Sequence, residues 1–178
     1  MTAVAPGARV FVDECKAKGY HIAATVVLPA EAKQVEKSLR RLLKPGQRRI
    51  HFNQESDSRR RLLLSRMAEL GVRVLIYTVR GEGERIARGA CLDALVDDLV
   101  AGRAHSLILE RHPPIEPYDR RVIREALLRN SRYELAYRHA DPGEHALLWV
   151  SDALAWCCNA GGEWKRRAGP MIAAHRVL

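Results

Sequence analysis

Apolar residues recur along the chain with two different periods, one typical of strands and one typical of amphipathic helices. Short runs rich in β-branched and aromatic residues predict strands, whereas apolar side chains spaced three and four residues apart predict helices. We expect strands at residues 8–14, 20–28, 48–52, 72–79, 106–110 and 133–139. We expect helices at residues 30–43, 57–70, 84 to about 101, 118–128 and 145–159.

The order of these elements predicts the fold class. The first two strands are joined by a short polar turn and form an antiparallel hairpin, and the later strands alternate with helices. This order predicts an α/β protein with a mixed central sheet and helices on both faces. We expect a single domain over residues 1–178, with residues 1–7 and about 168–178 loosely ordered.

Composition narrows the class of protein. Hydrophobic residues make up 47% of the chain, enough for a core, and no apolar run approaches the ~20 residues that span a bilayer. Residues 1–9 do not resemble a secretory signal. The four cysteines form no C-x-x-C pair, which disfavours a zinc or disulfide framework and favours a reducing cytoplasm. We expect no membrane partner and leave a homodimer open.

The charge balance favours a polyanionic partner. Lysine and arginine number 30 against 21 acids, giving a net charge of +9. Clustered cations release counterions when they neutralise phosphates, so we expect nucleic acid, DNA or RNA, as the partner. The alternative is a solvated arginine-rich surface from an arginine-biased, GC-rich bacterial genome. The predicted nucleic-acid contacts are Arg48, Arg49, Arg59, Arg60, Arg120, Lys165 and Arg166.

Carboxylates stand at two predicted strand ends. Asp13 follows an apolar strand, and Glu110 ends the strand Leu107–Leu109. Ligands of open α/β sheets bind at the carboxyl ends of strands. Two neighbouring carboxylates repel each other there unless a cation lies between them.

A third acid, Asp152, interrupts an apolar helical stripe. Its neighbours three and four residues away are Leu148, Trp149, Ala155 and Trp156. A buried carboxylate requires a partner. That partner is either a metal ion shared with Asp13 and Glu110 or an arginine. We interpret Trp149 and Trp156 as core residues rather than base-stacking residues.

Other polar residues near these elements have simpler interpretations. Glu55, taken alone, compensates the dipole of the helix that follows it, and Asp119 reads as a helix N-cap. Glu14 is expected on the sheet face opposite Asp13, because strand side chains alternate. His51 and His112 flank the sheet ends, where either is placed to contact phosphate or to transfer protons, although loop histidines usually do neither.

Three segments, in order, resemble a known family. Val-Asp-Glu at residues 12–14 resembles the V-D-E-S opening strand of a large actinobacterial-type group of RNase H-like proteins, known as a domain of unknown function. The segment IHFNQE at residues 50–55 and the segment LLWVSDALAW at residues 147–156 resemble that group's pre-helix segment and closing helix. Cys15 replaces the usual serine, and Glu110 stands where many relatives have aspartate.

The resemblance implies an RNase H-like fold and a site. RNase H-like nucleases have acids on the first strand, the first core helix, a later central strand and the last helix. In this sequence those acids are Asp13, Glu55, Glu110 and Asp152, with Asp13, Glu110 and Asp152 as metal ligands. The implied activity is phosphodiester hydrolysis with two Mg²⁺ or Mn²⁺ ions about 3.5–4 Å apart. The alternative is a non-catalytic RNase H-like module that binds nucleic acid or another protein.

Overall fold

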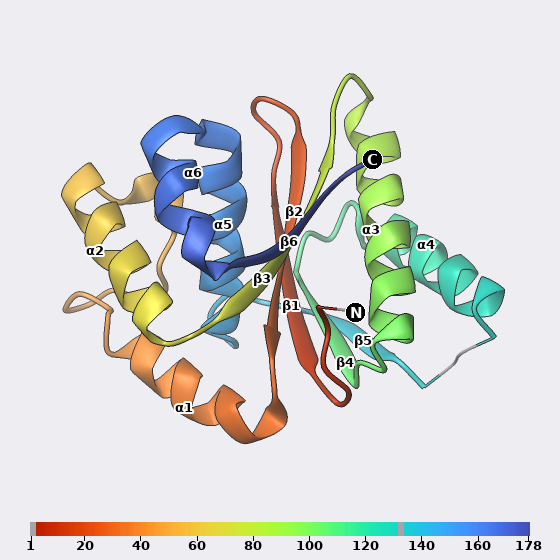
Figure 1. Ribbon diagram of the computed structural model, residues 1–178, viewed down its shortest axis with the longest axis horizontal. Coiled ribbons are helices and arrows are strands. Elements are labelled where there is room, and N and C mark those ends of the chain that lie inside the picture. Colours follow the sequence, from red (N-terminus) through yellow and green to blue (C-terminus); the bar gives the residue numbers. More distant parts are fainter. Residues whose placement is uncertain (1–2, 132–133) are drawn as a thin grey trace.

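The computed structural model describes residues 3–131 and 134–178, which form a mixed six-stranded sheet between two layers of helices (Figure 1). The strand order is β5-β4-β1-β2-β3-β6. β1, β2 and β3 are antiparallel neighbours, whereas β4 runs parallel to β1, β5 to β4 and β6 to β3. The strands are β1 (Arg9–Cys15), β2 (Tyr20–Val27), β3 (Arg73–Val79), β4 (Ser106–Glu110), β5 (Ala136–Ala140) and β6 (Ile172–Val177).

Helices cover both faces of the sheet, as the sequence predicts. On one face lie α1 (Pro29–Arg40), α2 (Asp57–Glu69), α5 (Leu147–Ala160) and α6 (Gly162–Ala168). On the other lie α3 (Glu84–Ala101) and α4 (Glu116–Arg129). Strand alternation divides the core between the faces: Phe11 packs on the α5 side and Val12 on the α3 side. No helix in the described ranges is both long and apolar enough to cross a membrane.

One predicted strand is absent. Residues 48–51 form no strand, and Phe52–Gln54 is a 3₁₀ turn. Ile50 and Phe52 are buried in the core, which explains the apolar pattern. The backbone oxygens of Phe52 and Asn53 accept hydrogen bonds from the Arg60 guanidinium instead of a neighbouring strand. The prediction of a strand at 48–52 was therefore wrong.

The C-terminal segment is more ordered than the sequence suggests. Gly161 caps the end of α5, close to the expected position, but α6 begins directly at Gly162. Residues 172–177 form β6 along the edge of β3, rather than the loose tail we expected. At the other edge of the sheet, the strand expected from residue 133 begins at Ala136, and residue 133 lies outside the described residues.

A buried histidine makes stability depend on pH. His21 is 4% exposed, and its Nδ1 lies 2.9 Å from Thr78 Oγ1, which lies 2.8 Å from His175 Nε2. Burial lowers the pKa of His21 to about 4, aided by the positive charges of His175, Arg80 and Lys165.

We expect the free energy of unfolding to fall as the pH drops from about 6.5 to about 4. In that window His21 is protonated in the unfolded chain but stays neutral in the folded protein. The free energy of unfolding therefore decreases by up to about 3 kcal/mol. Urea denaturation at several pH values measures this slope. His21→Gln, which retains a polar partner for Thr78, should flatten it, and an unchanged slope in that variant would contradict the assignment.

Candidate active site

The sheet register brings two of the predicted acids together. β1 and β4 run parallel with Val12 opposite Leu109, so Asp13 and Glu110 follow as neighbours at the carboxyl ends of both strands. The backbone amide of Glu14 donates to Asp13 Oδ1 at 2.7 Å. The third acid, Asp152, comes from α5, which packs across β1 and β2. Acids from distant parts of the sequence therefore meet at one end of the sheet.

The electrostatics show that these carboxylates interact. Burial, together with the negative charges of Glu110 and Asp152, raises the pKa of Asp13 well above its usual value. Burial also raises the pKa of Glu110, although its hydrogen bond with Asp13 and the nearby Arg49 oppose the rise. Two buried adjacent carboxylates resist double ionisation, and a cation between them would relieve this repulsion.

Asp152 has two partners from the connection between α1 and α2. Its Oδ2 accepts a hydrogen bond from the backbone amide of Phe52 at 2.8 Å and lies 3.4 Å from His51 Nδ1. The hydrogen bond to Asp152 raises the pKa of His51. Among the described residues no arginine pairs with Asp152, so its own partners are an amide and an imidazole. His51 thus belongs to the site, as its position at the sheet end suggests.

A pocket of about 340 Å³ opens beside Asp152. His51, Lys16 and Trp156 line it. The Trp156 indole N–H donates to Asn53 Oδ1 at 3.0 Å, and the Arg60 guanidinium lies 4.3 Å from its ring centroid. Trp156 is therefore half-buried and packs into the wall of the pocket. Trp149 is fully buried, which agrees with its interpretation as a core residue.

Glu55 lies apart from the other predicted acids. It accepts hydrogen bonds from Lys44 Nζ at 2.9 Å and Gln47 Nε2 at 2.6 Å, and Arg59 lies 3.9 Å away. These partners outweigh burial and lower the pKa of Glu55. Neither Asp13 nor Asp152 is among the hydrogen-bond and ion-pair partners of Glu55 in the described part of the chain, which are Lys44, Gln47 and Arg59. These contacts fix the loop between α1 and α2, and the catalytic role of Glu55 stays a prediction.

Some of the basic residues predicted to contact nucleic acid already bind groups within the protein, and others are free to contact a ligand. Arg59 donates to the Leu42 carbonyl oxygen, and Arg60 donates to three acceptors near its own helix. Both guanidinium groups therefore stabilise the protein's own structure. Arg120 pairs with Glu116 on α4. Arg49 reaches the site itself, with its Nη1 3.6 Å from Glu110 Oε1. The remaining predicted contacts have exposed or half-buried side chains: Arg48, Lys165 and Arg166.

Behind the site, on the α3 face, is an ionic network that the sequence did not reveal. Glu14 points there, as alternation predicts, and pairs with Arg88 Nη1 at 2.9 Å. Arg88 also donates two hydrogen bonds, of 2.6 and 2.8 Å, to the fully buried Asp119, and His139 Nε2 lies 2.8 Å from the same carboxylate. Asp119 is thus not an N-cap, a position that Ile115 occupies. An arginine at the buried face of a helix is the signal that identifies such a network.

The acids fit a hard divalent cation by chemistry but are not arranged around one. Asp13, Glu110 and Asp152 offer only carboxylate oxygens, the donors that Mg²⁺ and Mn²⁺ prefer. The raised pKa of Asp13 records a repulsion that a cation would relieve. Within the described ranges, however, no three histidine, cysteine, aspartate or glutamate side chains form a group that could hold a metal ion. Binding of a divalent cation would therefore require the side chains of these acids to move.

Comparison with known proteins identifies the fold. No protein-family model and no curated protein matches the chain, so the narrower resemblance to an actinobacterial-type group stays a prediction. Among solved structures, the chain is similar to RNase HII in the PCNA:RNase HII complex from Archaeoglobus fulgidus. The TM-score is 0.54 at 13% identity, over 87% of this chain and 73% of that chain. With its strand order and helix layers, this similarity shows that the chain has an RNase H-like fold.

Proposed function

We propose that this protein is a nuclease that hydrolyses phosphodiester bonds with the help of Mg²⁺ or Mn²⁺. The proposal depends on one observation: the parallel register of β1 and β4 makes Asp13 and Glu110 neighbours, and Asp152 of α5 lies close enough for its charge to act on both. Repulsion among these three carboxylates destabilises the folded state. Such an arrangement is typical of functional sites, where the clustered charge has a use. The RNase H-like fold and the net charge of +9 support a nucleic-acid substrate.

In this proposal Asp13, Glu110 and Asp152 hold the metal. The bound metal supplies an activated water and neutralises charge on the phosphate. His51 orients Asp152 through the 3.4 Å contact, and the Phe52 amide fixes the same oxygen. Arg49 lies 3.6 Å from only one oxygen of Glu110, so the other oxygen would be available to a cation and the Arg49 guanidinium would be placed to hold a phosphate oxygen.

The same geometry favours a second candidate, a non-catalytic nucleic-acid-binding module. Arg49 already lies beside Glu110, and the described residues contain no ready metal-holding group. A module of this kind binds nucleic acid with a steep salt dependence and cleaves nothing with any divalent ion. A cytoplasmic location and a homodimer remain predictions in either case.

A cleavage assay tests the proposal. Labelled single-stranded DNA, duplex DNA, RNA and an RNA–DNA hybrid are each incubated with Mg²⁺, with Mn²⁺ or with EDTA. We expect cleavage of at least one substrate with a divalent ion and none with EDTA. Asp152→Asn and Glu110→Gln should each reduce the rate by about two to three orders of magnitude, because each removes charge at the reacting phosphate.

Glu31→Gln is the matched control. Glu31 is exposed in the first turn of α1, which follows β2. Because β2 is antiparallel to β1, this turn lies at the end of the sheet opposite the three acids, so the replacement should leave cleavage unchanged. Equal cleavage by the wild type and Asp152→Asn would refute the nuclease proposal. Salt-sensitive binding without any cleavage would favour the non-catalytic module.

A further inference from the structure

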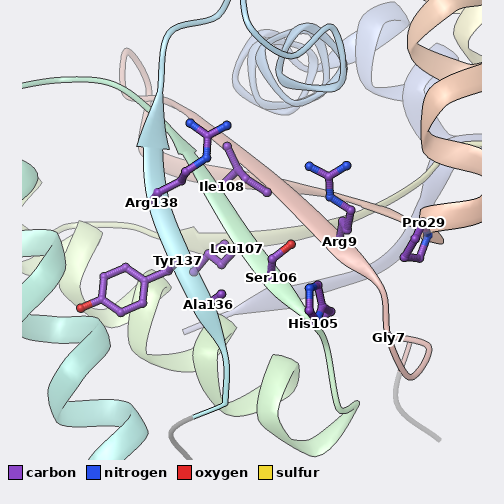
Figure 2. A pocket seen from close by; sticks show the side chains of 10 residues that line it. All are labelled: Gly7, Arg9, Pro29, His105, Ser106, Leu107, Ile108, Ala136, Tyr137 and Arg138. Atoms are coloured by element: carbon purple, nitrogen blue, oxygen red, sulfur yellow. The ribbon is translucent and has the colours of Figure 1, made fainter.

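A second pocket, of about 660 Å³, lies on the sheet face that contains the candidate active site (Figure 2). It opens over the amino-terminal halves of β4 and β5, beside the region that α5 covers on β1 and β2. None of the residues that line it is acidic. The residues that matter for recognition are Arg9, Ser106, Ile108, Ala136 and Arg138.

Strand register explains why these side chains share one face. Arg9 pairs with Ser106, and Ser106 with Ala136, so three neighbouring strands contribute one row. Two residues further along the strands, Ile108 and Arg138 form the next row, level with Phe11. Four residues along from Arg9 comes Asp13, about 13 Å away at about 3.3 Å per residue. The pocket is therefore separate from the carboxylates but on the same face.

Two guanidinium groups flank the apolar floor. In Figure 2 they lie on either side of Ile108. Arg138 is held by Glu144 Oε2 at 3.1 Å and His145 Nε2 at 2.7 Å. Arg9 rests over the Phe11 ring at 5.3 Å and has no ion pair or hydrogen bond among the described residues. Arg9 is thus a positioned cation without an anion, which is the arrangement that recognises phosphate or carboxylate.

The floor of the pocket combines apolar surface with one unsatisfied polar atom. Ile108 and Ala136 present aliphatic groups between the strands. The Ser106 hydroxyl oxygen is buried and has no hydrogen-bond partner within the described part of the chain. A buried hydroxyl without a partner is costly, so a ligand that supplies one would gain affinity.

We propose that this pocket binds a nucleoside monophosphate unit, either as a free nucleotide or as one unit of a strand. The phosphate contacts Arg9 and Arg138, the flat base covers Ile108 and Ala136, and a polar edge of the base meets the Ser106 hydroxyl. A ligand with a purely aliphatic body would leave that hydroxyl unpaired. The volume is within the range of about 300–1,000 Å³ that is usual for small-molecule sites.

Equilibrium binding in EDTA tests this proposal independently of any metal-dependent cleavage. The four common nucleoside monophosphates, adenosine and inorganic phosphate are titrated into the full chain by calorimetry. We expect saturable binding of at least one monophosphate and much weaker binding of adenosine. Arg9→Gln should weaken nucleotide binding about tenfold or more, because it removes a charge-assisted hydrogen bond.

Ala136→Phe is a second variant that leaves the charge unchanged. Position 136 is exposed on a strand, where phenylalanine is tolerated, and the ring would fill the floor. It should weaken nucleotide binding without weakening inorganic phosphate binding. Arg41→Gln, at the exposed end of α1, is the matched control and should bind as the wild type does.

A competition experiment distinguishes a free nucleotide from a nucleotide that is one unit of a strand. If a short labelled oligonucleotide is displaced by the monophosphate from the wild type but binds Arg9→Gln weakly, the occupant is a unit of a strand. If the oligonucleotide binds both proteins equally, the occupant is a free nucleotide. The proposal would be overturned if the wild type bound no nucleotide saturably, or if Arg9→Gln and Ala136→Phe both bound nucleotide as tightly as the wild type.

Discussion

Replacing Arg88 with methionine should lower the free energy of unfolding by about 3–5 kcal/mol. The Arg88 side chain is 3% exposed and neutralises Asp119, which is fully buried, and Glu14, whose side chain is 18% exposed. Methionine fills much of the space but leaves two carboxylates without their cation. An uncompensated buried charge costs far more than the lost ion pair itself contributes. Urea denaturation followed by circular dichroism measures the change.

An exposed arginine with two acidic partners provides the comparison. Arg129 pairs with Asp93 at 3.0 Å and Asp97 at 2.8 Å, but its side chain is 51% exposed. Arg129→Met should therefore cost no more than about 1 kcal/mol, because water solvates the remaining acids. Adding Asp119→Asn to the Arg88→Met protein should recover part of the loss. If Arg88→Met and Arg129→Met are equally stable, the buried network does not stabilise the fold in the way we describe.

Replacing Asp13 with asparagine should have opposite effects on activity and stability. Cleavage should fall by about two to three orders of magnitude, since a central carboxylate of the proposed site is lost. In EDTA, the free energy of unfolding should rise by about 1–2 kcal/mol, because the change removes a buried charge that repels Glu110 and Asp152. A structural acid would behave differently, since its loss would lower stability.

Metal addition extends the same test. Mn²⁺ should raise the melting temperature of the wild type, because an ion that binds only the folded state stabilises it. The Asp13→Asn protein should show little of this shift. Asp57→Asn, a change at an exposed acid of α2, is the control and should respond to Mn²⁺ as the wild type does. If Asp13→Asn is less stable than the wild type in EDTA, Asp13 is a structural residue rather than part of a metal site.

The environment of Glu55 could not be predicted from the sequence. A glutamate before a helix, in a segment that resembles a family motif, looked equivalent to the other acids. The fold places it beside Lys44 and Gln47, where its charge is already compensated. These partners lie 11 and 8 residues earlier in the chain, so no short window of sequence around Glu55 reveals them. The surrounding cations distinguish Glu55 from Asp13, and the catalytic role of Glu55 stays a prediction.

The sequence by itself determined most helices and strands, the mixed sheet and the position of Asp13, Glu110 and Asp152 on those elements. These features follow from local periodicity and from the alternation of side chains, which a short window of residues contains. Only the tertiary structure decided that β6 completes the sheet, that Arg88 neutralises Glu14 and Asp119, and that Arg9 faces an open pocket. Among 30 cationic and 21 acidic residues many pairings are possible, and long-range packing selects the few that form.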